Sequence, residues 1–271
     1  MTSAWLPTAP CTPRACVEST TAALRAVPRA VLRLTGVVLL LLAGLALSPL
    51  GARVPADVVR RWCRWIARAA GVRVRITGGP VPAGGLLLVA NHISWLDVPL
   101  LAAVRPARML AKTEVRHWPV AGGLAARGGT LFIDRDRLRA LPDTVARVAG
   151  ALRGGAAVAA FPEGSTWCGR AQGPFRRAVF QAALDAGVPV LPVRIAYRVD
   201  RGAASTAPAF VGDDTLLASV WRVATSRGLV AEVEVRPAIP AGRASDRRTL
   251  ARAAQRQVTP PPSGPHAVLM A

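Results

Sequence analysis

The 271-residue chain has few acidic residues and almost no lysine. Asp and Glu together number 15 against 35 Lys and Arg, nearly all of them arginine, and the net charge is +20. Such an imbalance predicts an anionic partner: nucleic acid, a phospholipid surface or a phosphorylated substrate. The sequence lacks zinc-finger spacing, aromatic ribonucleoprotein motifs and a basic zipper. A membrane surface is therefore the favoured partner, and no nucleic acid is expected.

Cysteine is also scarce, and its spacing points to no cysteine framework. The four cysteines are Cys11, Cys16, Cys63 and Cys168. They form no CxxC pair and no cluster with histidine along the chain, so the sequence indicates neither a zinc site nor a disulfide framework. A reducing compartment is expected, with no metal and no cofactor.

Length and composition suit one catalytic domain with appendages. Hydrophobic residues make up 52% of the chain and charged residues 18%, as in a globular or membrane-associated protein. Residues 1–29 open with a stretch rich in Pro, Thr and Ala and are predicted to form a flexible tail. Residues 258–271 are Pro-rich and are predicted to be disordered.

An apolar run without a single charge extends from Leu34 to Ala52 and is just long enough to cross a hydrocarbon core. It can be interpreted as a cleaved signal peptide, as a buried core helix, or as a membrane anchor that spans the bilayer or dips into one leaflet. The anchor is favoured, because the charged region before the run is long and no clean cleavage site follows it. Arginines flank both ends, and their slight excess after the run predicts a cell-membrane protein whose main domain is cytoplasmic.

The next segment, "ADVVRRWCRWIARAAG", has apolar residues at helical spacing, Trp62 and Trp65 among them, against a face of arginines. A basic helix with tryptophans on its apolar side suits a membrane interface, although an ordinary domain helix fits the pattern as well. Residues 30–70 are therefore predicted to form a membrane anchor followed by an interfacial helix.

From about residue 71 to 257, short apolar runs alternate with helical segments. Strands are predicted at 72–78, 86–90, 107–112, 129–134, 156–161, 188–197 and 230–239, and helices at 95–104, 139–153, 175–187 and 213–225. Several strands are apolar on both faces, which is typical of strands covered on both sides. This alternation predicts an α/β domain with a largely parallel sheet covered by helices.

A titratable pair, His92 and Asp97, follows the apolar strand "LLLVA". Open α/β sheets place their ligand sites at such strand ends. If Ser94 caps the next helix, Asp97 lies on its first turn and can reach back to the imidazole. A carboxylate that holds one ring nitrogen makes the other a better base, although a satisfied capping pair fits the spacing equally well.

Three further blocks bear on this choice: "GGTLFIDR", "FPEGST" and the proline-flanked strand "VPVLPV". Together with "NHISWLD", which carries the HX4D motif, they resemble in order and spacing the four blocks of the glycerolipid acyltransferases, the family that includes 1-acylglycerol-3-phosphate acyltransferase. The resemblance covers roughly residues 70 to 200. It implies a glycerol-3-phosphate-acyltransferase-like fold that acts on a lysophospholipid.

By this resemblance, His92 deprotonates the free hydroxyl of the acceptor, which attacks the thioester of acyl-CoA or acyl carrier protein, and Asp97 orients His92. Arg135 would hold the acceptor's phosphate, which suits a planar guanidinium. Glu163, Gly164 and Ser165 would line the polar head. The resemblance also implies possible substrate contacts at Asn91, Ser94, Lys112, Phe132 and Arg176.

Departures from the family pattern concern the acceptor's head group. Thr166 stands where many lysophosphatidate-acylating members carry arginine, and Arg176 and Ala178 replace a lysine and a glycine. This version looks closer to the acyltransferases that act on lyso-ornithine lipids. The expected product is phosphatidate, with lyso-ornithine lipid acylation as the alternative.

Two functions of other classes remain open. One is a hydrolase that uses His92 and Asp97 with Ser94 or Ser165 as the nucleophile. The other is a basic membrane-binding protein with a degenerate site, against which the intact set of blocks counts.

Overall fold

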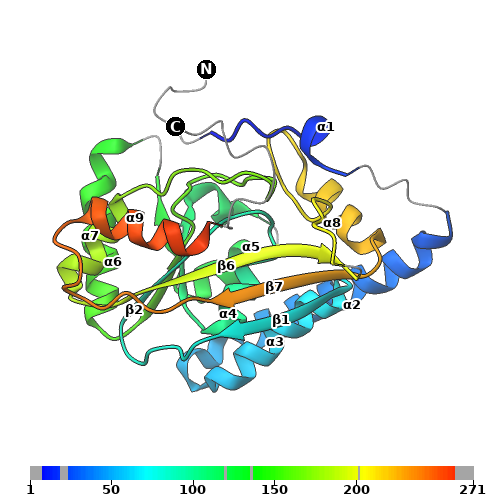
Figure 1. The fold of residues 1–271 in the computed structure, drawn as a ribbon. Helices are drawn as coiled ribbons and strands as arrows, with labels where there is room; N and C mark the ends of the chain where they lie inside the picture. Colours follow the sequence, from blue (N-terminus) through cyan, green and yellow to red (C-terminus); the bar gives the residue numbers. More distant parts are fainter. Residues whose placement is uncertain (1–7, 19–23, 119–120, 135–136, 201, 260–271) are drawn as a thin grey trace.

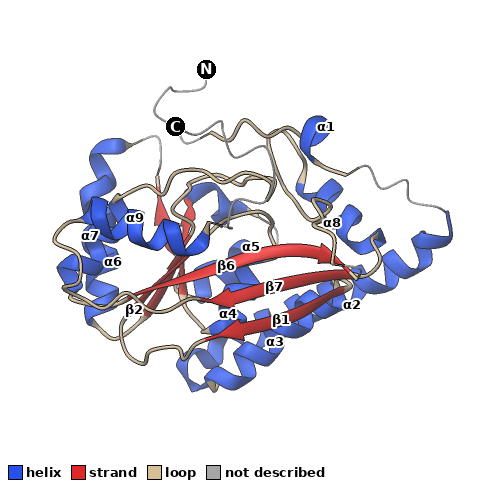
Figure 2. Ribbon diagram, viewed as in Figure 1, coloured by secondary structure: helices blue, strands red, loops and turns tan. Residues whose placement is uncertain are grey.

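The computed structural model describes residues 8–18, 24–118, 121–134, 137–200 and 202–259. Its centre is a seven-stranded sheet with the order β1-β7-β6-β2-β5-β3-β4 (Figures 1 and 2). The strands are β1 (Val72–Gly78), β2 (Leu86–Ala90), β3 (Arg108–Lys112), β4 (Leu131–Ile133), β5 (Ala157–Ala160), β6 (Val190–Val199) and β7 (Leu229–Val235). Every predicted strand is present, within a few residues at its ends.

The sheet is mostly parallel, as predicted. Strands β6, β2, β5, β3 and β4 pair in parallel. Strand β7 runs antiparallel to β6, and β1 pairs in parallel with β7. The strand β2 is fully buried, and its side chains alternate between two cores, because successive side chains of a strand point to opposite faces. This explains why its sequence, "LLLVA", is apolar throughout.

Helices cover both faces of the sheet. They are α1 (Pro13–Cys16), α2 (Val27–Leu47), α3 (Ala56–Ala69), α4 (Asp97–Val104), α5 (Ala121–Arg127), α6 (Leu141–Arg153), α7 (Ala178–Ala186), α8 (Leu216–Thr225) and α9 (Arg247–Val258). Buried residues of α2, α3, α4 and α8 share one core with the sheet. Buried residues of α6, α7 and α9 share the other. Figure 1 shows α2 and α3 side by side along the β1 edge.

The apolar run is part of one continuous helical stretch from Leu24 to Gly51, a candidate membrane span by length and composition, and only 11% of its most apolar window is buried. This exposure argues against a buried core helix. Arg33 donates to the backbone oxygens of Ala224 and Ser226 at the end of α8, at 2.8 and 2.7 Å. The Trp62 indole N–H donates to Leu40 O at 3.0 Å, so α2 is tied to the domain at two places along its length.

Part of the segment 1–29, which was expected to form a flexible tail, lies within the described residues. Residues 8–18 lie against the domain, where Cys11 is buried in the core shared with the sheet. The Glu18 carboxylate accepts hydrogen bonds from the Ser205 hydroxyl at 2.9 Å and from Thr206 N–H at 3.2 Å. At the other end, α9 continues to the buried Val258, and residues 260–271 lie outside the described residues.

Candidate active site

The predicted pair of His92 and Asp97 is formed at the carboxyl end of β2. Nδ1 of His92 lies 2.9 Å from Oδ2 of Asp97. Asp97 is completely buried, whereas 21% of the His92 side chain is exposed. The His92 ring stacks on the Phe161 ring, with centroids 3.9 Å apart and planes 7° from parallel. Phe161 directly follows β5, the neighbour of β2, so two adjacent strand ends hold the imidazole.

Backbone N–H groups fix the Asp97 carboxylate. Its Oδ2 accepts from the N–H groups of Ile93 at 2.6 Å and Ser94 at 2.8 Å. Ser94 is therefore not the predicted helix cap: α4 begins at Asp97 with Leu96 as its N-cap, and the Ser94 hydroxyl accepts from Leu96 N–H at 3.3 Å. A carboxylate that is held by donors acts as the acceptor toward His92, so Nδ1 carries the ring proton and Nε2 has its lone pair free.

A further partner of Asp97, the tyrosine Tyr197 on β6, was missed from the sequence. Its hydroxyl donates to Asp97 Oδ1 at 2.6 Å, and the residue is buried. Burial, followed by the charge of Asp97, raises the pKa of Tyr197 well above its usual range, so the phenol keeps its proton and donates it. Tyr197 is the chain's only tyrosine, but it stands 100 residues from Asp97 and within an apolar strand, where an aromatic residue is normally core.

Glu163 lies behind the pair rather than in an open pocket. Its Oε2 accepts from His92 N–H at 2.7 Å and its Oε1 from Gly173 N–H at 3.2 Å. Burial raises the pKa of Glu163 to about 8, against the lowering effect of these two hydrogen bonds. Trp167 N–H adds a bond to His92 O at 2.8 Å. The loop after β5 thus holds the backbone of His92, a role that the sequence did not indicate for Glu163.

The other residues of the first and third blocks lie in the same region. The Asn91 side chain exchanges two 2.9 Å hydrogen bonds with the backbone of Ile195 and so joins β2 to β6 just before His92. Gly164 has a φ of 77°, which only glycine adopts readily, and turns the loop after Glu163. The Ser165 Oγ is buried and has no hydrogen-bond partner within the described part of the chain.

The remaining predicted residues are less closely tied to His92. Lys112 is exposed at the end of β3, and Phe132 lies on the paired strand β4 with the Arg116 guanidinium 4.8 Å from its ring centroid. Arg176 is exposed, and its backbone N–H bonds to Pro162 O at 2.8 Å. Arg135 lies outside the described residues, two positions after the end of β4.

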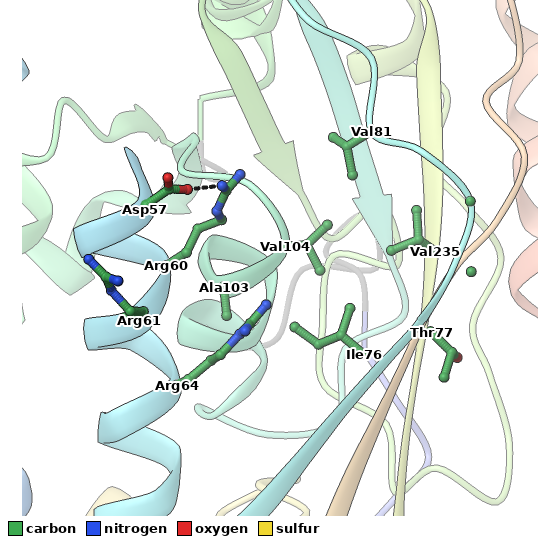
Figure 3. Close-up of a pocket in the computed structure, with 12 residues that line it drawn as sticks. Asp57, Arg60, Arg61, Arg64, Ile76, Thr77, Val81, Ala103, Val104 and Val235 are labelled. Carbon is green, nitrogen blue, oxygen red and sulfur yellow. Dashed lines mark hydrogen bonds and ion pairs between the residues drawn. The ribbon is translucent and has the colours of Figure 1, made fainter. Parts of the chain in front are cut away.

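One cavity lies away from the His92–Asp97 pair. It has a volume of about 450 Å³ and is lined by Arg60, Arg61 and Arg64 of α3, by the end of β1 and by Ala103 and Val104. Figure 3 shows the three arginines along α3, with Arg60 paired to Asp57. Ala103 and Val104 end α4, whereas Asp97 begins it, which places the cavity about 10 Å along that helix from the pair. This basic groove is therefore separate from the His92–Asp97 pair.

Comparison with known proteins agrees with the site. The family described as Acyltransferase matches residues 73–196. Lyso-ornithine lipid O-acyltransferase of Pseudomonas aeruginosa is 40% identical over 238 residues, which cover 83% of this chain and 89% of that protein. The 1-acyl-sn-glycerol-3-phosphate acyltransferase of Neisseria gonorrhoeae is 35% identical over 175 residues, 64% of this chain and 68% of that protein.

The fold is shared as well. The crystal structure of the 1-acyl-sn-glycerophosphate acyltransferase PlsC from Thermotoga maritima superposes with a TM-score of 0.57 at 19% identity, covering 87% of this chain and 95% of that one. The fold and the relatives together define the class of enzyme, an acyltransferase. The chain belongs to the acyltransferase family whose relatives acylate lysolipids, as the four sequence blocks predicted.

Proposed function

We propose that this protein transfers a fatty acyl group from an acyl thioester to the free hydroxyl of a lysolipid. The observation that carries the proposal is the His92–Asp97 pair, with a buried carboxylate bound at 2.9 Å to a partly exposed imidazole. Acyl-CoA or acyl carrier protein is the donor, and the reaction requires no cofactor. The family membership and the names of the relatives support this reading.

The pair supplies general-base catalysis. His92 Nε2 takes the proton of the acceptor hydroxyl as its oxygen attacks the thioester carbonyl carbon. Asp97 stabilises the imidazolium that forms, because it lies buried against the opposite ring nitrogen. The carbon–sulfur bond then breaks, and the thiolate leaves with the proton held by His92. Arg135 remains our proposal for the acceptor's phosphate.

Two acceptors suit the chain: 1-acyl-sn-glycerol-3-phosphate, which would give phosphatidate, and lyso-ornithine lipid. The second is favoured by a specific observation, since the P. aeruginosa relative with that name aligns over more of this chain, 83%, than does the gonococcal lysophosphatidate enzyme, 64%. The departures at Thr166, Arg176 and Ala178 point the same way.

The hydrolase alternative needs an accessible serine beside His92. Ser94 is completely buried, and its hydroxyl accepts a backbone hydrogen bond from Leu96. The Ser165 Oγ is buried as well. Neither serine has a hydrogen bond to His92 among those found in the described residues, so an acceptor hydroxyl from outside the protein suits the base better.

We further propose that α2 and α3 hold the enzyme on the cytoplasmic side of the cell membrane, with α2 in one leaflet. Large apolar side chains on the outer face of α2, such as Leu32 and Leu39, are exposed, as is Trp65 of α3. A helix tied along the domain at Arg33 and Leu40 presents one side to lipid. The arginines of the basic groove also belong to α3, and phosphate head groups are their expected partners.

The test is acyl transfer by membranes that contain the protein, with labelled acyl-CoA or acyl carrier protein and each acceptor in parallel. We expect one lysolipid to be acylated and His92→Ala to lower the rate at least about 100-fold, the usual scale for a lost general base. His117→Ala removes an exposed histidine and should retain the wild-type rate. Thioester consumption without lysolipid acylation would favour the hydrolase. A wild-type rate for His92→Ala as well as for His117→Ala would refute the role of His92 as the general base.

A further inference from the structure

Three of the four cysteines meet in the folded protein. The Sγ atoms of Cys11, Cys16 and Cys168 all lie within 4.8 Å of one another. Cys11 and Cys168 are buried and Cys16 is half-buried, while Cys63 is buried apart from them on α3. Their separation along the chain concealed the cluster, since Cys168 is more than 150 residues from the other two. Such a cluster uses groups for which the acyl-transfer chemistry has no role.

The cluster joins two segments with different tasks. Cys11 and Cys16 belong to the N-terminal segment that carries α1 and lies against the domain. Cys168 directly follows Trp167, whose N–H bonds to His92 O at 2.8 Å, in the loop that also carries Glu163. Anything that binds all three sulfurs therefore clamps residues 8–18 onto the loop that supports the catalytic histidine.

We propose that Cys11, Cys16 and Cys168 form a binding site for a thiophilic cation, with zinc as the ion to be tested first. Thiolates are the preferred ligands of zinc and copper(I). At a zinc–sulfur distance of about 2.3 Å, tetrahedral ligand sulfurs stand about 3.8 Å apart, so side-chain movements of about 1 Å suffice here. Each thiol that binds the ion releases its proton to solvent, and water completes the coordination.

The surroundings of the sulfurs suit a metal better than a disulfide. A disulfide uses two sulfurs at about 2 Å and leaves the third thiol alone, whereas a cation uses all three. The backbone N–H of Cys168 also hydrogen-bonds the Cys11 sulfur, a contact that stabilises the thiolate form. Burial otherwise raises the pKa of Cys11 to about 12, and a bound divalent cation is the charge that would offset this cost.

The test is zinc retention by the full-length protein without a metal-binding tag, purified in detergent under a thiol-free reductant. After loading with zinc and passage through a desalting column, we expect about one zinc ion per chain by mass spectrometry. Cys168→Ser should lower the zinc content at least about tenfold. Cys63→Ser removes a cysteine outside the cluster and is the matched control, which should retain zinc. Zinc should raise the melting temperature of the wild type and of Cys63→Ser but not of Cys168→Ser.

Cobalt substitution makes the test independent of the variants' folding. Cobalt bound by the wild-type protein should give a thiolate-to-metal charge-transfer band and the visible absorption of a tetrahedral site, which added zinc abolishes. Zinc retained equally by Cys168→Ser, or not retained by the wild type, would overturn the proposal. So would full alkylation of all four thiols in the presence of zinc. None of these readouts involves acyl transfer, so their outcome does not depend on the proposed activity.

Discussion

Asp97 makes more hydrogen bonds than any other side chain described at the site. Of its partners, Tyr197 can be substituted with the smallest change in structure. Tyr197→Phe deletes the 2.6 Å bond to Oδ1 and keeps the ring. Because Asp97 retains two backbone donors, we expect kcat to fall by about tenfold or less with KM unchanged. An unpaired buried carboxylate oxygen should also lower the free energy of unfolding by about 1–3 kcal/mol. Steady-state kinetics with the lysolipid that the enzyme acylates measure the effect on kcat, and a thermal melt measures the effect on stability.

Asp97→Asn is the severe counterpart. The amide oxygen can take the place of Oδ2, but the amide carries no negative charge to stabilise a protonated His92, and its NH2 group replaces the Oδ1 that accepts from Tyr197. Loss of activity should reach about 100-fold to 10,000-fold, the range of general-base catalysis. If Tyr197→Phe is as damaging as Asp97→Asn, Tyr197 does more than position the carboxylate.

Glu163 predicts a pH dependence of stability. The pKa of its carboxyl is raised from 4.5 to about 8 in the folded protein, chiefly by burial. The folded state therefore holds the proton more tightly than the unfolded state, and this contribution to stability is fully present below about pH 4.5 and lost as the pH rises through about 8. Each unit of pKa corresponds to about 1.4 kcal/mol, so the contribution is a few kcal/mol.

The measurement is the melting temperature of wild type and Glu163→Gln between pH 5 and pH 9, a range that brackets the raised pKa of about 8. The wild type should lose stability relative to the Gln variant as the pH rises, because the amide does not titrate. Asp213→Asn, which removes an exposed carboxyl, should follow the wild type. Parallel curves for wild type and Glu163→Gln would mean that the carboxyl does not retain its proton in the folded state.

At the scale of elements, the packing of α2 on α3 rests on a glycine. A Cβ added at Gly44 would overlap the ring of Trp62, which is also held by its bond to Leu40. Gly44→Ala should therefore force the helices apart and cost about 1–3 kcal/mol, as overpacking does. Gly150→Ala is the matched control, since Gly150 is exposed in α6 with open space around it. Alanine there should raise the melting temperature slightly.

Both melts are taken in the same detergent. A lower melting temperature for Gly44→Ala with a raised or unchanged one for Gly150→Ala supports close packing of the two helices. Equal effects at both positions would show that α2 is free of α3 in solution.

Local sequence patterns predicted most helices and strands, but not the contacts between residues far apart in the sequence. The strand β2 was predicted to the residue, because "LLLVA" is an apolar run bounded by glycines and Asn91. The helix α9 was missed, since only Leu250, Ala251, Ala254 and Val258 of its polar sequence are buried. The bonds of Tyr197 to Asp97 and of Glu163 to His92 N–H join residues 100 and 71 positions apart. No spacing rule reaches that far, so the contact between His92 and Asp97 was predictable, but the hydrogen bonds from Tyr197 and to Glu163 were not.

At the scale of the whole molecule, a net charge of +20 and an exposed apolar helix both favour binding to an anionic membrane surface. The charge should strengthen binding to anionic vesicles at low salt, while the apolar side chains of α2 keep a salt-resistant share of the binding. Replacing Arg60, Arg61 and Arg64 with Gln removes three charges from the basic groove. At about 1 kcal/mol per arginine near a membrane, and with Asp57 already opposing them, vesicle affinity should fall about tenfold to a hundredfold.

The matched control removes the same charge from the far side of the sheet. Arg247, Arg248 and Arg252 are exposed on α9, whose buried residues belong to the other core. Their replacement by Gln should change vesicle affinity far less, because a charge facing away from the membrane is screened beyond about 10 Å at moderate salt. Flotation with anionic and neutral vesicles at low and high salt separates the cases. Equal losses for the two triple variants would mean that net charge alone attracts the protein, with no preferred face.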